Sequence, residues 1–326
     1  MKKFLKILGA LIVVLILVVV GVYGWATLTV SRLRARTVET HSADFPIPFP
    51  IDPADPAAAG LTEDAARQLA QQRAVERGKH LVEARYTCTG CHSANFGGGV
   101  MVDAFPIGSL LGPNLTLGTG SRTADYQPRD LDRIVRHGVR QDGHPAVMPS
   151  EEFQHMSDQE LSDIVSFIRS RPPVNNTVPE STFGPLGKIL VMTSQFRFSA
   201  DVIESHTAPH AARPPEAAES AEFGKHLAQV CIGCHGPDFS GGPITGGDPA
   251  WPPARNLTPD ATGLKGWTYD QFMAAVSKSQ RPDGTAIREP MTLIAPYGRN
   301  MTEVEGHALW AYLQSLPPVS KTIAQK

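Results

Sequence analysis

Two segments, Cys88-Thr89-Gly90-Cys91-His92 and Cys231-Ile232-Gly233-Cys234-His235, share the frame Cys-x-x-Cys-His. The chain has 326 residues and four cysteines, and all four cysteines lie in these two segments. No cysteine therefore remains for a disulfide bond elsewhere or for a lone thiol nucleophile. These segments decide how the rest of the chain is interpreted.

The Cys-x-x-Cys-His frame is typical of c-type haem attachment. Two thiols three positions apart on one helical turn can each add to a vinyl group of one porphyrin, and the next residue brings an imidazole under the iron. A redox Cys-x-x-Cys pair needs no histidine, and half of a structural zinc site is the other alternative. A histidine after both pairs favours two covalently bound haem c groups. The predicted attachment residues are Cys88, Cys91, Cys231 and Cys234, and the predicted first iron ligands are His92 and His235.

An internal repeat surrounds the two motifs. Each half of the chain has Gly-Lys-His-Leu before its motif, and Asn-Leu-Thr, Asp-Gly and Pro-Pro-Val after it, in the same order. These segments begin at Gly78, Asn114, Asp142 and Pro172 in the first half and at Gly224, Asn256, Asp283 and Pro317 in the second. A chain of this length has room for two cores. We predict two similar domains, residues 61–176 (the first half) and 216–326 (the second half).

The repeat also predicts a second ligand for each iron. Met148 lies 56 positions after His92, and Met291 lies 56 positions after His235. A Met/His pair is the ligation that raises the reduction potential of cytochromes c. We therefore predict Met148 and Met291 as the sixth ligands.

Other methionines and histidines are alternatives for that role. Met156 and Met301 come closest among the methionines, but each directly precedes a helix start, where a hydrophobic staple residue packs. His80 and His226 occupy matching places and would give bis-histidine ligation. The remaining histidines have no counterpart in the other half and are expected at the solvated surface: His41, His137, His144, His155, His206, His210 and His307.

Each half closes with a predicted helix. Both helices begin at an S/T-x-x-E capping box, continue with apolar residues at helical spacing and stop before Pro-Pro. The capping boxes are Ser157–Glu160 and Thr302–Glu305. Alanine-rich helical segments precede Gly78 and Gly224. Each glycine either allows close approach of the closing helix, at Phe167 or Tyr312, or ends its own helix.

The N-terminal region carries an apolar run without charged residues from Ile7 to about Val30, long enough to cross a bilayer as a helix. A cleaved signal peptide would have a shorter apolar region and a small-x-small site, which Tyr23 and Trp25 interrupt. We expect an uncleaved anchor over residues 1–30.

Two further segments connect the predicted parts of the chain. Residues 31–60 are rich in proline and alanine and predict a semi-rigid spacer, or else a segment packed on the first half. Residues 177–215 predict a linker that packs on one or both halves; contact with the membrane surface is the alternative.

Together these residues make the chain resemble a membrane-anchored dihaem cytochrome c with two class I cytochrome c domains. The resemblance covers nearly everything from about Leu61 onward. It implies a mainly α fold, with an N-terminal transmembrane helix followed by two tandem class I cytochrome c-like domains. It also implies that the Pro113 carbonyl accepts a hydrogen bond from the proximal histidine. In the second half Arg255 replaces this proline, so either its carbonyl takes that role or its side chain meets a haem propionate.

The resemblance implies electron transfer between periplasmic or membrane-bound redox partners, such as a dehydrogenase that feeds a respiratory chain. Haem attachment outside the cytoplasm implies a single-pass protein of the inner membrane with its haem domains on the periplasmic side. Such a carrier is not itself an enzyme. A dihaem peroxidase-like enzyme with one open haem site is the alternative, and the equal His-to-Met spacing argues against it. The net charge of −2 argues against nucleic acid as a partner.

Overall fold

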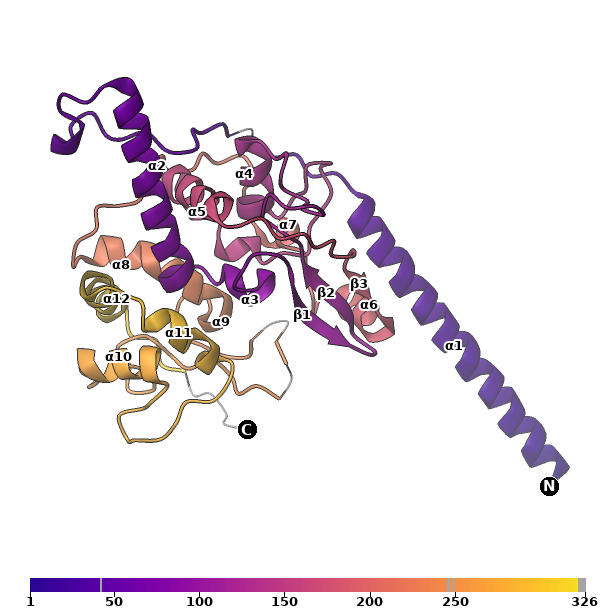
Figure 1. The fold of residues 1–326 in the computed structure, drawn as a ribbon. Coiled ribbons are helices and arrows are strands. Elements are labelled where there is room, and N and C mark those ends of the chain that lie inside the picture. The colour runs from indigo at the N-terminus through magenta and orange to yellow at the C-terminus, as the bar shows by residue number, and fades with distance from the viewer. Residues whose placement is uncertain (42, 245–246, 249, 322–326) are drawn as a thin grey trace.

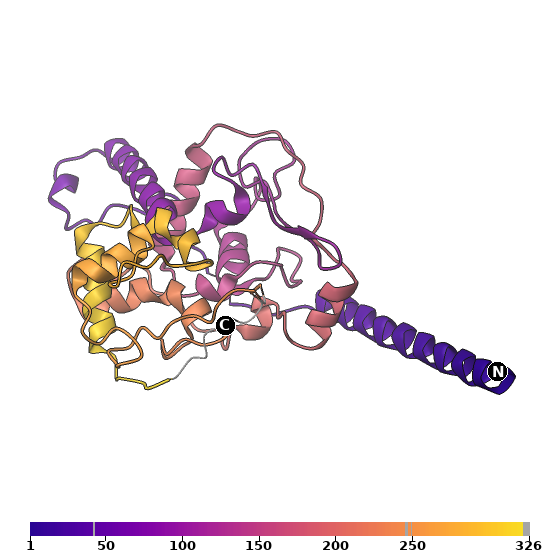
Figure 2. The same ribbon diagram turned by 90° about the horizontal axis from the view of Figure 1, so that it is seen from below.

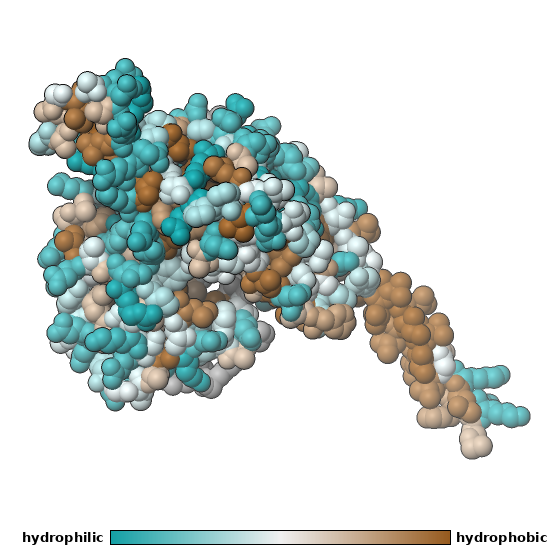
Figure 3. All heavy atoms as spheres, in the orientation of Figure 1, coloured by the Kyte–Doolittle hydropathy of each residue, from teal (hydrophilic) through white to brown (hydrophobic). Residues whose placement is uncertain are grey.

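The computed structural model describes residues 1–41, 43–244, 247–248 and 250–321. One long helix, α1 (Lys2–Ala35), projects from a body in which the second half lies beside the first (Figures 1 and 2). Within the described residues, α1 is the one helix long and apolar enough to cross a membrane, with a mean hydropathy of 3.0 over its most apolar window. Its apolar side chains are exposed along nearly its whole length (Figure 3). The helix ends at Ala35, beyond the predicted limit at residue 30.

The body is mainly helical, as predicted. The spacer contains a short 3-10 turn, η1 (Pro56–Ala58). The first half contains α2 (Glu63–His80), a π-helical turn η2 (Leu81–Arg85), α3 (Cys88–His92), α4 (Pro128–His137), η3 (Ser150–Glu152) and α5 (Asp158–Ser170). The second half contains α8 (Ala221–Leu227), η4 (Ala228–Cys231), α9 (Ile232–His235), α10 (Tyr269–Lys278), η5 (Met291–Ile294), α11 (Ala295–Gly298) and α12 (Glu303–Ser315).

In each half the first helix crosses the closing helix at the repeated glycine. A Cβ added at Gly78 would lie 2.0 Å from the Asp163 carbonyl oxygen and 2.8 Å from Phe167 Cβ. At Gly224 it would lie 1.9 Å from the Ala308 carbonyl oxygen. These distances leave no room for a side chain, so the prediction of close approach is confirmed and that of a helix terminus is wrong.

The closing helices start and stop where the sequence predicts. Ser157 and Thr302 are the N-caps, and each accepts a hydrogen bond from the backbone N–H three residues on, at Glu160 and Glu305. The glutamate carboxylates accept from the N-cap backbone at 2.8 Å in return. Both helices end two residues before the first proline of Pro-Pro.

A small antiparallel sheet joins the first half to the linker. Strand β1 (Gly99–Ala104) pairs with β2 (Gly108–Gly112), and β2 pairs in turn with β3 (Thr182–Phe183). This sheet was not predicted, because its strands are short and its third strand comes from the linker.

The spacer and the linker both pack on the first half. Phe45 is buried in the first core, and Ser162 Oγ donates to the Pro46 carbonyl at 2.7 Å. The linker helix α6 (Pro185–Met192) lies against α1, where Lys188 Nζ contacts Tyr23 Oη at 3.0 Å. A second linker helix, α7 (Ser199–Val202), packs near η3. The prediction that the linker packs on the body is confirmed. Of the two alternatives for the spacer, the one in which it packs on the first half is correct.

Four of the histidines expected at the surface are instead gathered against α4. His137 is buried, and His41, His206 and His210 are largely covered around it. Their prediction as solvated residues is wrong, because the spacer and the linker fold over this side of the first half and cover it. His155 is exposed, as expected, and His144 and His307 are partly exposed.

Candidate haem-binding sites

The first motif forms a single short helix. Helix α3 carries Cys88, Cys91 and His92, and the His92 Nδ1 atom lies 2.8 Å from the Pro113 carbonyl oxygen. This hydrogen bond fixes the ring orientation and places the proton on Nδ1, which leaves Nε2 free to bind a metal. The predicted role of the Pro113 carbonyl therefore agrees with the geometry.

The second motif reaches the same arrangement with a different residue. Cys231 ends the turn η4, Cys234 and His235 follow on α9, and His235 Nδ1 lies 2.7 Å from the Arg255 carbonyl oxygen. Of the two roles considered for Arg255, its backbone takes the one played by Pro113. A backbone acceptor does not depend on the side chain, so the loss of the proline is tolerated.

Burial keeps the residues of both motifs in their neutral forms. It raises the pKa of Cys88 and of Cys231 to about 12, so both are neutral thiols at neutral pH. Burial also lowers the pKa of His92 and of His235, which keeps each imidazole neutral and able to bind iron. The residues present therefore fit a covalently bound haem.

A buried asparagine anchors the loop after each motif. Asn114 Nδ2 donates to the Val174 carbonyl at 2.7 Å, while its Oδ1 accepts from Thr116 N–H at 2.9 Å. Asn256 makes the matching bonds with Val319 and Thr258, at 2.7 and 2.9 Å. The repeated Asn-Leu-Thr and Pro-Pro-Val segments thus meet in space. Their parallel recurrence in the sequence was the signal for this contact, but the repeat alone did not show that they join.

The predicted methionine ligands lie in the same cores as their motifs. Met148 and Cys88 are both half-buried against the core of the first half, and Met291 and Cys231 against the core of the second. Met156 is fully enclosed in the first core, which suits its role as a staple residue. Ligation by Met148 and Met291 stays a prediction.

The two repeated histidines point across the boundary between the halves. His80 Nε2 lies 2.8 Å from Glu305 in the second half, and His226 Nε2 lies 2.8 Å from Glu160 in the first. Their partners are the capping-box glutamates of the opposite half. These contacts engage the Nε2 atom of each ring with a carboxylate of the opposite half.

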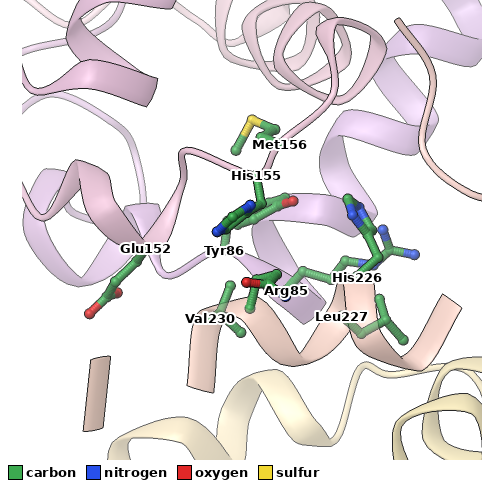
Figure 4. Close-up of a pocket in the computed structure, with 9 residues that line it drawn as sticks. Arg85, Tyr86, Glu152, His155, Met156, His226, Leu227 and Val230 are labelled. Carbon is green, nitrogen blue, oxygen red and sulfur yellow. The ribbon is translucent and has the colours of Figure 1, made fainter. Parts of the chain in front are cut away.

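Arg85 joins the same two glutamates. Its Nε donates to Glu305 at 2.8 Å, and its NH1 donates to Glu160 at 3.1 Å. Arg85 has no equivalent in the second half, because Cys88 follows Gly78 by ten positions whereas Cys231 follows Gly224 by seven. The longer connection forms the π-helical turn η2. Figure 4 shows Arg85 beside His226 in the small pocket between the halves.

Each motif also lies against the opposite half. Thr89, inside the first motif, is 2.9 Å from Tyr297 Oη on α11. Gly233, inside the second motif, packs against Glu152 on η3: a Cβ there would lie 2.6 Å from Glu152 Oε1. Burial, together with the charge of Glu151, raises the pKa of Glu152 to about 7. Both motifs therefore line one interface, and this reciprocal contact was not visible in the sequence.

Two helical units, each with a Cys-x-x-Cys-His helix whose histidine is held by a backbone carbonyl, define a c-type cytochrome. The cytochrome c family model matches residues 75–172 and 221–317, and the chain belongs to this family, with two cytochrome c domains. Both matched ranges fall within the predicted halves.

Similar proteins include subunits of quinone-dependent enzymes. The chain is 29% identical over 265 residues to the cytochrome c subunit of alcohol dehydrogenase (quinone) from Gluconacetobacter polyoxogenes, covering 71% of this chain and 54% of that protein. It is 26% identical over 293 residues to the corresponding subunit from Gluconobacter oxydans (strain 621H), covering 80% and 59%. A third similar protein is the gluconate 2-dehydrogenase cytochrome c subunit from Pantoea cypripedii, 32% identical over 116 residues, covering 33% of this chain and 25% of that protein. The chain thus spans little more than half the length of the first two relatives.

Proposed function

We propose that this chain is a dihaem electron-transfer subunit that accepts electrons from a membrane-associated dehydrogenase and passes them toward a respiratory chain. The observation that carries the proposal is the shared interface: each motif contacts the opposite half, through Thr89 and Tyr297 and through Gly233 and Glu152. Two redox groups attached there would lie close to each other. The similar proteins described above are cytochrome subunits of dehydrogenases, which supports the same role.

Each residue of the site has a defined task in this proposal. Haem, when bound, supplies a one-electron iron couple whose potential is set by its axial ligands. Cys88, Cys91, Cys231 and Cys234 attach the two groups, and His92 and His235 bind the irons. The carbonyls of Pro113 and Arg255 orient these histidines, and Met148 and Met291 complete the ligation.

The anchor gives the proposal its location. Helix α1 has 34 residues, and at about 1.5 Å per residue it exceeds the roughly 30 Å hydrocarbon core of a bilayer. Its C-terminal part is buried at Ala26 and Val30, so the first half would sit directly at the membrane surface. We place the chain in the inner membrane as a single-pass protein with its haem domains in the periplasm.

The test uses the full chain, purified from membranes in detergent. We expect a pyridine haemochrome assay to give two haems c per chain, and ferric spectra to show methionine ligation at both. We also expect a quinone-dependent dehydrogenase that co-purifies with the chain to reduce both haems. High-spin iron in one half together with peroxide turnover would contradict the proposal and favour a peroxidase.

A further inference from the structure

A cluster of three histidines and one aspartate lies on the side of the first half covered by the spacer and the linker. Asp132 and His137 belong to α4, His41 to the spacer and His210 to the linker. Each residue offers one ligand atom, and these atoms all lie within 4.8 Å of one another. The Asp132 side chain is fully buried and that of His137 almost so.

The spacing of the ligand atoms suits one metal ion. His137 Nε2 and His210 Nε2 are 3.2 Å apart, and Asp132 Oδ2 is 3.5 Å from His41 Nε2 and 3.8 Å from His137 Nε2. Ligands bound to a tetrahedral zinc ion at roughly 2.0–2.2 Å lie about 3.3–3.6 Å from one another. The four side chains are therefore placed close to the arrangement that zinc requires.

The outer nitrogens of two rings are already engaged. His41 Nδ1 is 3.2 Å from the His206 carbonyl oxygen, and His137 Nδ1 is 3.2 Å from His206 Nδ1. His206 Nε2 in turn lies 3.2 Å from the Ala200 carbonyl oxygen, so its proton belongs on Nε2 and its Nδ1 accepts. This network places protons on the outer nitrogens of His41 and His137 and directs their Nε2 lone pairs inward, as in metal-bound histidines.

Two inward-facing atoms are buried without a hydrogen-bond partner: His41 Nε2 and Asp132 Oδ2. The other Asp132 oxygen, Oδ1, accepts from Arg136 at 2.7 Å, so the carboxylate is held with Oδ2 toward the histidines. Leaving such groups unpaired costs about 1–3 kcal/mol each. A cation at the centre would satisfy both atoms.

The balance of charge around the cluster also favours binding of a cation. Arg136 is buried between Asp132 and Asp158 and pairs with both, at 2.7 and 2.8 Å. The two carboxylates outweigh this one guanidinium.

We propose that His41, Asp132, His137 and His210 bind a divalent transition-metal ion of the zinc type. Imidazole nitrogens with one carboxylate suit Zn²⁺. Four protein ligands fill a tetrahedron and leave no open position, which makes the site structural. His41 and His210 lie outside both segments that match the cytochrome c family model. The metal would fasten the spacer and the linker to α4.

The test uses the full chain in detergent with its haems attached, stripped with a chelator and then re-equilibrated with Zn²⁺ alone. We expect one zinc per chain by elemental mass spectrometry, with protein measured by amino-acid analysis. The zinc X-ray absorption edge should show four nitrogen and oxygen neighbours at about 2.0–2.2 Å with imidazole scattering. No bound zinc at micromolar concentration in the unmodified chain would overturn the proposal.

Variants separate this site from chance surface binding. His210→Ala and, independently, His41→Ala should lose the stoichiometric zinc while the haem spectrum stays unchanged, which shows that the fold survives. His206→Ala should weaken zinc binding about 10–100-fold, because His206 positions a ligand without being one. The matched control is His307→Ala. The ring of His307 stacks on Tyr269 in the second half, away from the cluster, so this variant should bind zinc like the unmodified chain. Zinc retained by both His210→Ala and His41→Ala would refute the assignment.

Discussion

At the scale of single residues, the axial ligands provide the sharpest test. Met148→Ala should remove methionine ligation from the haem of the first half alone, so that the near-infrared methionine-to-iron band falls to about half of its intensity. Met291→Ala should remove the other half, and the potential of the altered haem should fall in each case. Ferric absorption spectra and redox titration measure both effects.

Met156→Leu is the control for these variants, because Met156 is enclosed in the first core and leucine conserves its volume. Its spectrum should match that of the unmodified chain. If Met156→Leu loses the band and Met148→Ala keeps it, Met156 is the iron ligand and Met148 is not.

The anchoring role of the buried asparagines leads to a second prediction at this scale. Asn114→Ala removes the donor to the Val174 carbonyl and the acceptor for Thr116, and should lower the free energy of unfolding by about 2–4 kcal/mol, since it leaves buried backbone groups unpaired. Chemical denaturation followed by haem absorption measures the change. Asn95→Ala, at an exposed position between α3 and β1, should have a small effect, and equal losses in both variants would contradict the anchoring role.

At the scale of elements, the crossing of α2 with α5 and of α8 with α12 depends on one glycine each. Gly78→Ala and Gly224→Ala would place a methyl group about 2 Å from a backbone carbonyl oxygen, and overpacking of this kind costs about 3 kcal/mol or more. We expect low yields of folded, haem-loaded chain and lower midpoints of thermal unfolding. Gly24→Ala in α1, where an added Cβ meets nothing within 4 Å, should behave like the unmodified chain.

The elements also show which features the sequence could predict. The haem-motif helices, the capping boxes and the glycine crossings are local or repeated patterns, and each follows from a few neighbouring residues. The strand pair Gly108 and Phe183 and the cluster of His41, Asp132 and His210 could not be predicted, because their members are far apart in the chain. Only the folding of the spacer and the linker over the first half brings them together.

At the scale of the whole molecule, the interface between the halves should respond to acid. Burial opposes ionisation of Glu305, but hydrogen bonding to His80 and the charge of Arg85 lower its pKa from 4.5 to about 2. A depressed carboxylate pKa stabilises the folded interface above the unfolded pKa, and this stabilisation is lost as the pH falls through the folded value. The halves should therefore loosen between about pH 4.5 and 2, and small-angle scattering should show an increased radius of gyration.

Glu305→Gln isolates this effect, since it removes the charge while keeping the shape. We expect it to weaken the interface by about 2 kcal/mol and to reduce the acid response. Glu303→Gln, at an exposed position of the same helical turn, is the matched control. If the acid transition is unchanged in Glu305→Gln, other carboxylates cause it. Glu160 is one of these: burial opposes ionisation of its carboxyl group, but the hydrogen bond with His226 outweighs burial and lowers its pKa.

The guanidinium of Arg85, shared by Glu160 and Glu305, makes the two halves of the chain unequal. A chimaera made of two copies of the second half would bring the same two carboxylates together without a cation between them, whereas two copies of the first half would bring a second guanidinium into a space shaped for one. This inequality comes from the longer connection of the first half, which forms η2. The two halves are therefore not interchangeable, because Arg85 and the turn η2 that places it belong to the first half alone.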